Sequence, residues 1–346
     1  MLMPMLAIHK AMLYGAGDLR IEEELFDPSV LKPGDALVRT VVSGFSTGTD
    51  LGNYEGRSTE VPGAPDYPRG VGYSNVGVVE LVNGGEGRLR PGDHVFSMRS
   101  HCSFYTASQS DLLVSIPAGV DLEQASLAYL THLGVAGMRR VHYETGEDVA
   151  VVGLGVIGLC TLAIARAMGA RVAAIANDER RAELARQLGA HEVHLSGKFD
   201  PARVFDGRGA DVVVLTANPW QAYRDSVEMA RMGGRIAVLG FPGRAQEAVP
   251  FNPLDMQWLY GKQLTIAGAG YLPFTDCPPS EIRFNVRRDL EFVLNCLASG
   301  TMNLAPIISH RFPFQRMREA YELAKAHSKQ LSAAVFLWNR ANSPDQ

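Results

Sequence analysis

The sequence contains few cysteines, and it lacks the long apolar or strongly charged runs that mark several classes of protein. Its 346 residues include four cysteines, and no two of them form a Cys-x-x-Cys pair. We therefore expect neither a disulfide framework nor a structural zinc finger. Reduced thiols in the cytoplasm are the preferred interpretation.

Charge and hydropathy argue against two further kinds of partner. The net charge is −4, so no basic surface is expected for nucleic acid or for an anionic membrane. No stretch approaches the roughly 20 apolar residues of a membrane-spanning helix. The N-terminus does not begin with the basic residues of a secretory signal. We expect a cytoplasmic protein that acts on a small molecule.

One stretch carries the strongest functional signal. Residues 148–152, Asp-Val-Ala-Val-Val, are typical of a strand buried on both faces, and they lead into Gly153-x-Gly155-x-x-Gly158 and an apolar-striped helix. A second strand is expected at 171–176. In this context the glycines predict a dinucleotide site, because they allow a tight turn, a close approach of backbone to pyrophosphate, and close packing of helix on strand. The alternative is that they serve packing alone.

The pattern on either side divides the chain into two architectures. Residues 10–120 contain short strands separated by Gly, Pro and Asp, which favours a small all-β barrel. Helices at 122–140 and 221–232 then alternate with strands, as in an open parallel sheet that binds its ligand at the carboxyl ends of the strands. The C-terminal helices and strand leave this alternation, and we expect them to complete the first domain.

Motifs along nearly the whole chain resemble the medium-chain dehydrogenase/reductase superfamily. They are residues 43–50 (Ser-Gly-Phe-Ser-Thr-Gly-Thr-Asp), 72–74, 91–95, the glycine motif and 180–190. The resemblance implies an α/β protein with a GroES-like β-barrel catalytic domain, residues 1–128 and 272–346, and a Rossmann domain with a doubly wound parallel sheet, residues 129–271. Within the superfamily, the chain looks closest to bacteriochlorophyllide and threonine- or sorbitol-dehydrogenase-like proteins.

The sequence departs from the zinc-binding members of the superfamily at their metal site. Those members have a Cys before Gly-Thr-Asp, a His in Gly-His-Glu, and a Cys or Glu near the helix that enters the nucleotide domain. The corresponding residues here are Ser46 or Thr47, Tyr73 and about Tyr129. Hydroxyl and phenol groups are poor ligands for Zn²⁺. The family's four-cysteine zinc lobe is also missing. We therefore predict a site without metal and a reaction without zinc.

Without zinc, hydrogen-bond donors must assist the substrate oxygen. The resemblance matches Thr49 to the hydroxyl that relays the substrate proton in zinc alcohol dehydrogenases, although the family's next relay, a His, is Gly52 here. Tyr73 is a candidate general acid or a half-buried strand tyrosine. His101 is a proton carrier or a structural residue. Ser46 lines the pocket or belongs to a turn.

Other residues near these motifs have weaker signals. Asp50 is expected to orient neighbouring groups. Tyr54, Tyr129 and His132 are reserve candidates that are more typical of a core. The loops expected to line the substrate pocket contain Arg57, Arg69, Tyr271 and Phe274.

The residue expected to meet the adenosine ribose is Ala176, about 20 residues past the glycines. A missing carboxylate removes both the hydrogen bond to NAD and the repulsion of a 2′-phosphate, so NADP(H) is predicted over NAD(H). The alternative is that Asp178 reaches the ribose. The expected cofactor contacts are Gly153, Gly155, Val156, Ile157, Gly158, Asn177, Arg180, Arg181, Thr216, Gly240 and Ala269.

Three functions remain open. The retained Gly48-Thr49-Asp50 element favours a zinc-independent, NADP(H)-dependent oxidoreductase that interconverts a ketone and a secondary alcohol, on a polyol, cyclitol or natural-product scaffold. The second is reduction of an activated C=C bond, although the Asn-Tyr/Phe-x-Asp segment of those relatives is not found. The third is a nucleotide-binding protein without turnover.

The segment 263–269 predicts a strand at the edge of the parallel sheet. A flat apolar edge strand is covered or pairs with another subunit, so we expect a homodimer across it. Size-exclusion chromatography with light scattering is expected to give a dimer at micromolar concentration, and a monomer alone would exclude this pairing.

Overall fold

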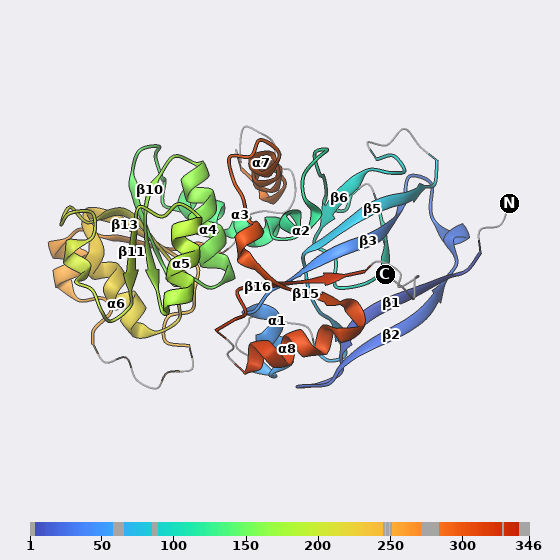
Figure 1. Ribbon diagram of the computed structural model, residues 1–346, viewed down its shortest axis with the longest axis horizontal. Coiled ribbons are helices and arrows are strands. Elements are labelled where there is room, and N and C mark those ends of the chain that lie inside the picture. Colours follow the sequence, from blue (N-terminus) through green and yellow to red (C-terminus); the bar gives the residue numbers. More distant parts are fainter. Residues whose placement is uncertain are drawn as a thin grey trace. The chain divides into compact units, whose positions relative to one another are not determined.

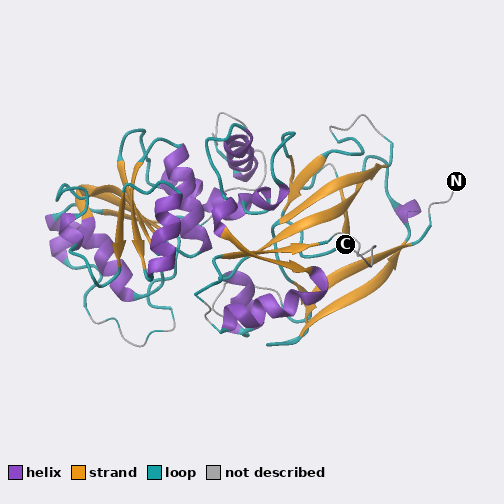
Figure 2. Ribbon diagram, in the orientation of Figure 1, coloured by secondary structure: helices purple, strands orange, loops and turns teal. Residues whose placement is uncertain are grey.

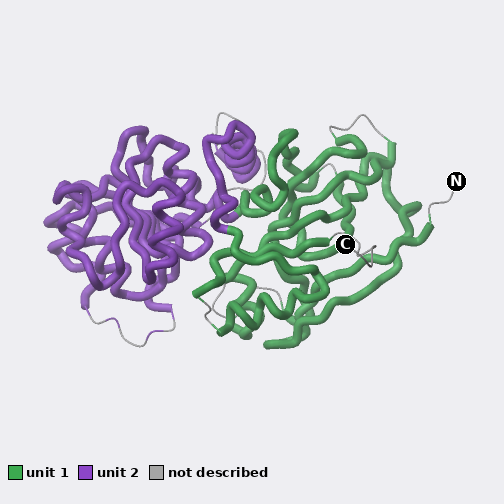
Figure 3. Tube along the Cα trace, viewed as in Figure 1, with its two compact units in different colours: residues 1–129, 308–346 green, residues 130–307 purple. Residues whose placement is uncertain are grey.

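The computed structural model describes residues 4–57, 66–84, 89–108, 110–244, 246, 249, 251–270, 284–326 and 329–338. The chain forms two compact units (Figure 3). Unit 1 comprises residues 1–129 and 308–346, and unit 2 comprises residues 130–307.

Unit 2 is built on a six-stranded parallel sheet. In chain order its strands are β9 (Asp148–Val152), β10 (Arg171–Ala176), β11 (Glu192–Leu195), β12 (Ala210–Leu215), β13 (Ala230–Val238) and β14 (Thr265–Gly268). Their spatial order is β11-β10-β9-β12-β13-β14, which is the order of a doubly wound fold with its switch point between β9 and β12. Helices α4 (Val156–Ala167), α5 (Glu179–Gln187) and α6 (Trp220–Met229) pack on the strands (Figures 1 and 2). This cover explains why β9 is apolar on both faces.

The helix expected at 122–140 is two helices, so that prediction is wrong. They are α2 (Leu122–Ala125) and α3 (Ala128–Arg140). The break has a physical cause at Ser126, whose carbonyl accepts a hydrogen bond from the Ser74 hydroxyl and whose own hydroxyl donates to the Glu123 carbonyl, 2.7 Å away. Such side-chain bonds compete with the helical ladder.

The helix expected at 221–232 ends earlier, at Met229, and β13 begins at Ala230. Lys262 is the reason. Its ammonium donates to the carbonyls of Val227, Glu228 and Ala230 at 3.0, 2.6 and 2.9 Å. A lysine at this place satisfies the carbonyls that the end of α6 leaves without a helical donor.

Helix α7 (Val286–Ala298) belongs to unit 2, whereas the sequence assigned all of residues 272–346 to the first domain. The observed boundary lies at residue 308 instead. Asp289 on α7 is fully buried, and its carboxylate accepts a hydrogen bond from Arg139 Nε at 2.9 Å. The imidazole of His132 lies 3.8 Å from the same carboxylate. This ion pair joins α7 to α3, and it gives His132 a structural environment.

Unit 1 is a β-rich unit with two sheets. The larger sheet contains β3 (Ala36–Phe45), β5 (Asn75–Val82), β6 (His94–Ser97), β7 (Phe104–Ala107), β8 (Leu113–Ser115), β15 (Ile308–Pro313) and β16 (Ala333–Leu337). The smaller one contains β1 (Leu6–Leu13), β2 (Leu19–Phe26) and β4 (Arg69–Gly70). Helices α1 (Thr49–Tyr54) and α8 (Met317–Lys325) pack against each other, around a core that includes Phe45, Tyr321 and Phe336.

Two further expectations concern the surface. Strand β14 lies at the edge of the parallel sheet, as expected, and dimerisation across it stays a prediction. In the part of the chain that the structure describes, every helix is too short or too polar to span a bilayer.

Candidate active site

The turn after β9 has the geometry of a nucleotide-binding turn. Gly153 has φ +92°, which favours glycine, and a Cβ on Gly158 would lie 1.8 Å from the Gly153 carbonyl oxygen. Gly155 is the N-cap of α4, and a Cβ there would meet nothing within 4 Å. Val156 is buried behind the turn and Ile157 is half-buried. There is thus room for an anion beside the helix N-terminus.

The predicted cofactor residues outside this turn follow other strands of the same sheet. Thr216 follows β12, Gly240 comes shortly after β13, and Ala269 follows β14. Because the strands are parallel, their carboxyl ends meet at one edge. Thr216 Oγ1 donates to the Gly153 carbonyl at 2.7 Å, which joins two of these turns directly. A Cβ on Gly240 would lie 2.7 Å from the Ala217 carbonyl oxygen, so this turn is also tightly packed.

The turn after β10 contains the residues expected to choose between the two nicotinamide cofactors. Asp178 is the N-cap of α5 and accepts the Arg181 backbone N–H at 2.9 Å. The Arg181 guanidinium lies 3.3 Å from the Asp178 carboxylate and donates to the Leu154 carbonyl at 2.6 Å. Asp178 is therefore occupied in capping and ion pairing. Arg181 ties this turn to the glycine turn, while Asn177 and Arg180 are exposed.

A pair of hydroxyls forms the centre of the candidate site in unit 1. The Tyr73 phenol donates to Ser46 Oγ at 2.6 Å, and the Tyr129 ring packs edge-on against Tyr73 with centroids 5.2 Å apart. Burial and the nearby Asp50 carboxylate raise the pKa of Tyr73, although hydrogen bonds from Ser46 and Thr49 lower it in part. The phenol therefore keeps its proton and acts as a donor. Thr49 begins α1 and is exposed.

His101 lies deeper than the sequence suggested. Its side chain is fully buried, and burial lowers its pKa to about 3, so the imidazole is neutral. Nδ1 lies 2.8 Å from Ser43 Oγ, and Nε2 lies 4.0 Å from Asp50 Oδ2. The structure thus brings His101 to Asp50 in the interior of unit 1.

Sequence reasoning missed Ser43, Gly72 and Trp338, which surround this imidazole. Trp338 Nε1 donates to Ser43 Oγ at 2.8 Å, and a Cβ on Gly72 would lie 2.4 Å from His101 Nε2. A buried indole N–H signals that some acceptor must be near. Nothing in the sequence says which one, because the contact joins residues almost 300 positions apart.

The remaining candidates lie in varied surroundings. Tyr54 is buried in the core of unit 1 and bonds to Glu322. Arg69 is buried and donates to Asn53 Oδ1 at 3.1 Å, and Arg57 pairs with Glu55. Tyr271 and Phe274 lie outside the described residues.

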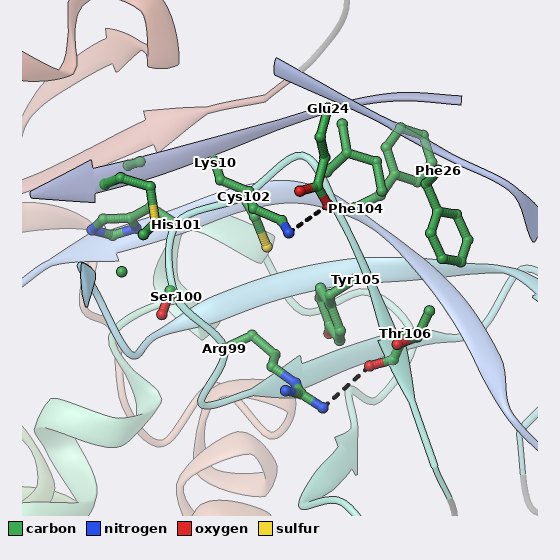
Figure 4. Close-up of a pocket in the computed structure, with 14 residues that line it drawn as sticks. Lys10, Glu24, Phe26, Arg99, Ser100, His101, Cys102, Phe104, Tyr105 and Thr106 are labelled. Carbon is green, nitrogen blue, oxygen red and sulfur yellow. Dashed lines mark hydrogen bonds and ion pairs between the residues drawn. The ribbon is translucent and has the colours of Figure 1, made fainter. Parts of the chain in front are cut away.

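Unit 1 also contains a cavity of about 360 Å³ lined by residues of β1, β2 and β7 (Figure 4). Lys10 and Arg99 face it, and both have partners: Lys10 pairs with Glu24 at 2.5 Å, and Arg99 donates to the Thr106 carbonyl at 3.2 Å. Burial raises the pKa of the Cys102 thiol there to about 12, so it is not a nucleophile. The cavity shares His101 with the site above but none of its hydroxyls.

Comparison with known proteins relates this geometry to a family. Residues 156–284 match the family model described as zinc-binding dehydrogenase. The chain is 32% identical over 223 residues to L-threonine 3-dehydrogenase of Bacillus licheniformis, covering 60% of this chain and 57% of that one. It is 23% identical over 351 residues to sorbitol dehydrogenase of Mus musculus, covering 90% and 91%. The chain spans about half the length of the threonine dehydrogenases that it matches.

Solved structures show the same fold. Galactitol-1-phosphate dehydrogenase from Escherichia coli aligns with a TM-score of 0.80 at 18% identity, covering 95% of this chain and 99% of that one. Alcohol dehydrogenase from Thermus sp. ATN1 aligns with a TM-score of 0.75 at 24% identity, with the same coverage. The predicted α/β class, with a GroES-like part and a Rossmann sheet, is confirmed.

The prediction that this chain uses no zinc is wrong, because the matching family is that of zinc-binding dehydrogenases. The error came from reading three positions alone. Ser46 and Tyr73 bond to each other at 2.6 Å, and the phenol is held protonated. Zn²⁺ takes thiolate, imidazole or carboxylate ligands, so this hydroxyl set does not fit it. Within the described ranges, no three His, Cys, Asp or Glu side chains gather to hold a metal ion.

The glycine turn yields a prediction that separates packing from binding. Gly158→Ala should lower the free energy of unfolding by about 1–3 kcal/mol, because its Cβ would overlap the Gly153 carbonyl. Gly155→Ala should lower the unfolding free energy by less, since its Cβ meets open space and only the N-cap preference for Gly is lost, yet weaken dinucleotide binding about tenfold by blocking the pyrophosphate. Thermal unfolding and fluorescence titration measure the two effects. Wild-type affinity in Gly155→Ala would show that no pyrophosphate approaches this turn.

Proposed function

We propose, because residues 156–284 match the zinc-binding dehydrogenase model and the chain is similar to threonine and sorbitol dehydrogenases, that it is an oxidoreductase interconverting a ketone and a secondary alcohol with a nicotinamide dinucleotide. The observation that carries the proposal is the Tyr73–Ser46 hydroxyl pair, with its 2.6 Å hydrogen bond, in a chain that also has the glycine turn. Curated relatives are named for threonine and sorbitol, which both carry secondary hydroxyls. Those names support a hydroxylated substrate such as a polyol or cyclitol.

The cofactor would be held by the turns of unit 2. The N-terminus of α4 and the backbone at Gly155 would bind its pyrophosphate. The turns that carry Thr216, Gly240 and Ala269 lie at the same edge of the sheet, where the rest of the dinucleotide would extend. When bound, the nicotinamide supplies or accepts the hydride.

The hydroxyls of unit 1 would act on the substrate oxygen. During reduction of a ketone, negative charge develops on that oxygen, and a protonated phenol can donate a hydrogen bond and then its proton. Tyr73 suits this role because its raised pKa keeps the proton in place until an alkoxide, a stronger base, forms. Ser46 accepts from Tyr73 and so fixes the direction of the phenol. Thr49, exposed at the start of α1, would exchange the proton with solvent.

Tyr73→Phe should lower kcat for a reactive ketone or alcohol about 100-fold, because it removes the donor to the developing charge. The affinity for NADPH should stay unchanged, since Tyr73 is not among the nucleotide contacts. Tyr105→Phe is the matched control: Tyr105 is also a buried tyrosine of unit 1, but it lines the separate cavity, so kcat should stay at the wild-type value.

The assay itself tests the proposed chemistry. Purified protein is incubated with NADPH and a panel of ketones, with NADP⁺ and the matching alcohols and polyols, and with activated alkenes. Each reaction is run with and without added Zn²⁺. Turnover of alkenes alone would replace this proposal with C=C reduction. Tight NADPH binding without turnover on any panel would indicate a protein that only binds nucleotide.

NADP(H) is the cofactor we propose over NAD(H). Strand β10 ends at Ala176, which offers no carboxylate to a ribose. Asp178, the alternative ribose ligand, caps α5 through one carboxylate oxygen, and the other lies buried 3.3 Å from the Arg181 guanidinium. Asn177 and Arg180 are exposed on the same turn and suit the recognition of a 2′-phosphate.

NADPH should therefore give a higher kcat/KM than NADH. Arg180→Ala should lower kcat/KM for NADPH about tenfold, the effect of one lost charge-assisted hydrogen bond, and leave the value for NADH unchanged. Arg186→Ala, near the other end of the same helix, is the control and should change neither value. A wild-type preference for NADH would reject the assignment.

A further inference from the structure

The side chain of Asp50 connects the two segments that carry the proposed reacting hydroxyls. It is almost completely buried in the first turn of α1. Oδ2 accepts the backbone N–H of Ser46 at 3.0 Å, and Oδ1 accepts the backbone N–H of Gly72 at 3.1 Å. Ser46 follows β3, and Gly72 directly precedes Tyr73. One carboxylate thus holds the backbone on both sides of the Tyr73–Ser46 hydrogen bond.

Hydrogen-bonded side chains also lie on the other side of this carboxylate. Trp338 Nε1 can only donate, so Ser43 Oγ accepts there and can pass its own hydrogen to His101 Nδ1. We assign the His101 hydrogen to Nε2 on this basis. That atom lies 4.0 Å from Asp50 Oδ2. At this distance His101 borders the carboxylate without a hydrogen bond to it.

A carboxyl group satisfies this geometry better than an amide does. The two backbone N–H groups both need acceptors, and an ionised Asp provides an acceptor on each oxygen. An Asn in the same place would accept one N–H and turn its NH₂ toward the other. Burial raises the pKa of Asp50 to about 7, and the two backbone bonds oppose that rise. The close contact of Gly72 with the His101 ring leaves no room for the segment to shift toward His101.

We propose that Asp50 is a positioning residue for the Tyr73–Ser46 hydroxyl pair. It fixes the loop after β3 and the segment before β5 relative to each other. Hydrogen bonds to the backbone, and not packing alone, therefore set the direction of the phenol. The inference rests on the proposed oxidoreductase function for its kinetic consequence. Its structural part, two backbone amides bound to one carboxylate, stands independently. Asp50 itself need not touch the substrate.

The test compares Asp50→Asn with the wild-type enzyme on the most active ketone of the panel. We expect kcat to fall about 10- to 100-fold through misaimed donors, while KM and the affinity for NADPH change little. Asp27→Asn is the matched control, because Asp27 also accepts a backbone N–H in unit 1, that of Ser29 at 2.9 Å, but lies far from the hydroxyls in sequence. It should keep the wild-type kcat.

Amide hydrogen exchange supplies a readout that needs no substrate. In the wild-type protein, the amides of Ser46 and Gly72 should exchange more slowly than that of the exposed Gly48. In Asp50→Asn, at least one of the two should exchange faster. If Asp50→Asn does not fold, the wild-type rates decide: two slow amides support the proposal.

Three results would overturn the proposal. The first is fast exchange at Ser46 and Gly72 in the wild-type protein, and the second is a wild-type kcat in Asp50→Asn. The third is a lower kcat together with a higher KM and a lower unfolding temperature in Asp50→Asn, which marks a purely structural residue. Absence of turnover in the wild-type protein would instead remove the proposed function and leave the exchange result to decide the role of Asp50.

Discussion

Unit 1 depends on a carboxylate that lies almost wholly out of water. Transferring such a group from solvent into a protein interior costs several kcal/mol unless hydrogen bonds compensate. At Asp50 the compensation comes from backbone amides, which are fixed by the path of the chain and cannot swing away as a surface lysine can. The two backbone amides that offset the free energy of burying Asp50 are therefore the same groups that fix the two loops. The carboxylate is tolerated only while the two loops stay in place, so its burial stabilises one arrangement of those loops over others.

In unit 2, glycine residues rather than hydrogen bonds fix the positions of the turns at the edge of the sheet. A Cβ at Gly158 cannot coexist with the Gly153 carbonyl at 1.8 Å, and Gly240 is similarly confined by the turn after β12. Strand and helix therefore approach more closely than other residues would permit. The exposed N-terminus of α4 is a consequence of that approach. Its unpaired amide dipoles lie where the carboxyl ends of the parallel strands meet, which is the region where such sheets bind ligands.

Local patterns were sufficient to predict the parallel sheet of unit 2 and its glycine turn, and insufficient for several other details in both units. The glycine turn and the parallel strands follow from short segments whose meaning depends on neighbouring residues only. The break at Ser126 does not, because it depends on the Ser74 hydroxyl from a distant strand. The placement of α7 depends on the pair of Arg139 with Asp289, which are 150 residues apart. For the same reason His101 could be chosen as a candidate from the sequence, but its burial against Asp50 could not be foreseen.

The prediction about zinc failed for a different reason. It inferred the absence of a metal from the residue types at three positions only. What the side chains themselves establish is narrower. Burial and Asp50 raise the pKa of the Tyr73 phenol, which therefore keeps its proton, and its hydrogen bond to Ser46 directs that proton. A donor and a Lewis acid both act by reducing negative charge on the substrate oxygen. The contribution that we propose for Tyr73 is therefore donation of a hydrogen bond or a proton. The same buried Asp50 that aims the phenol also strengthens its hold on the proton, so position and protonation state are set together.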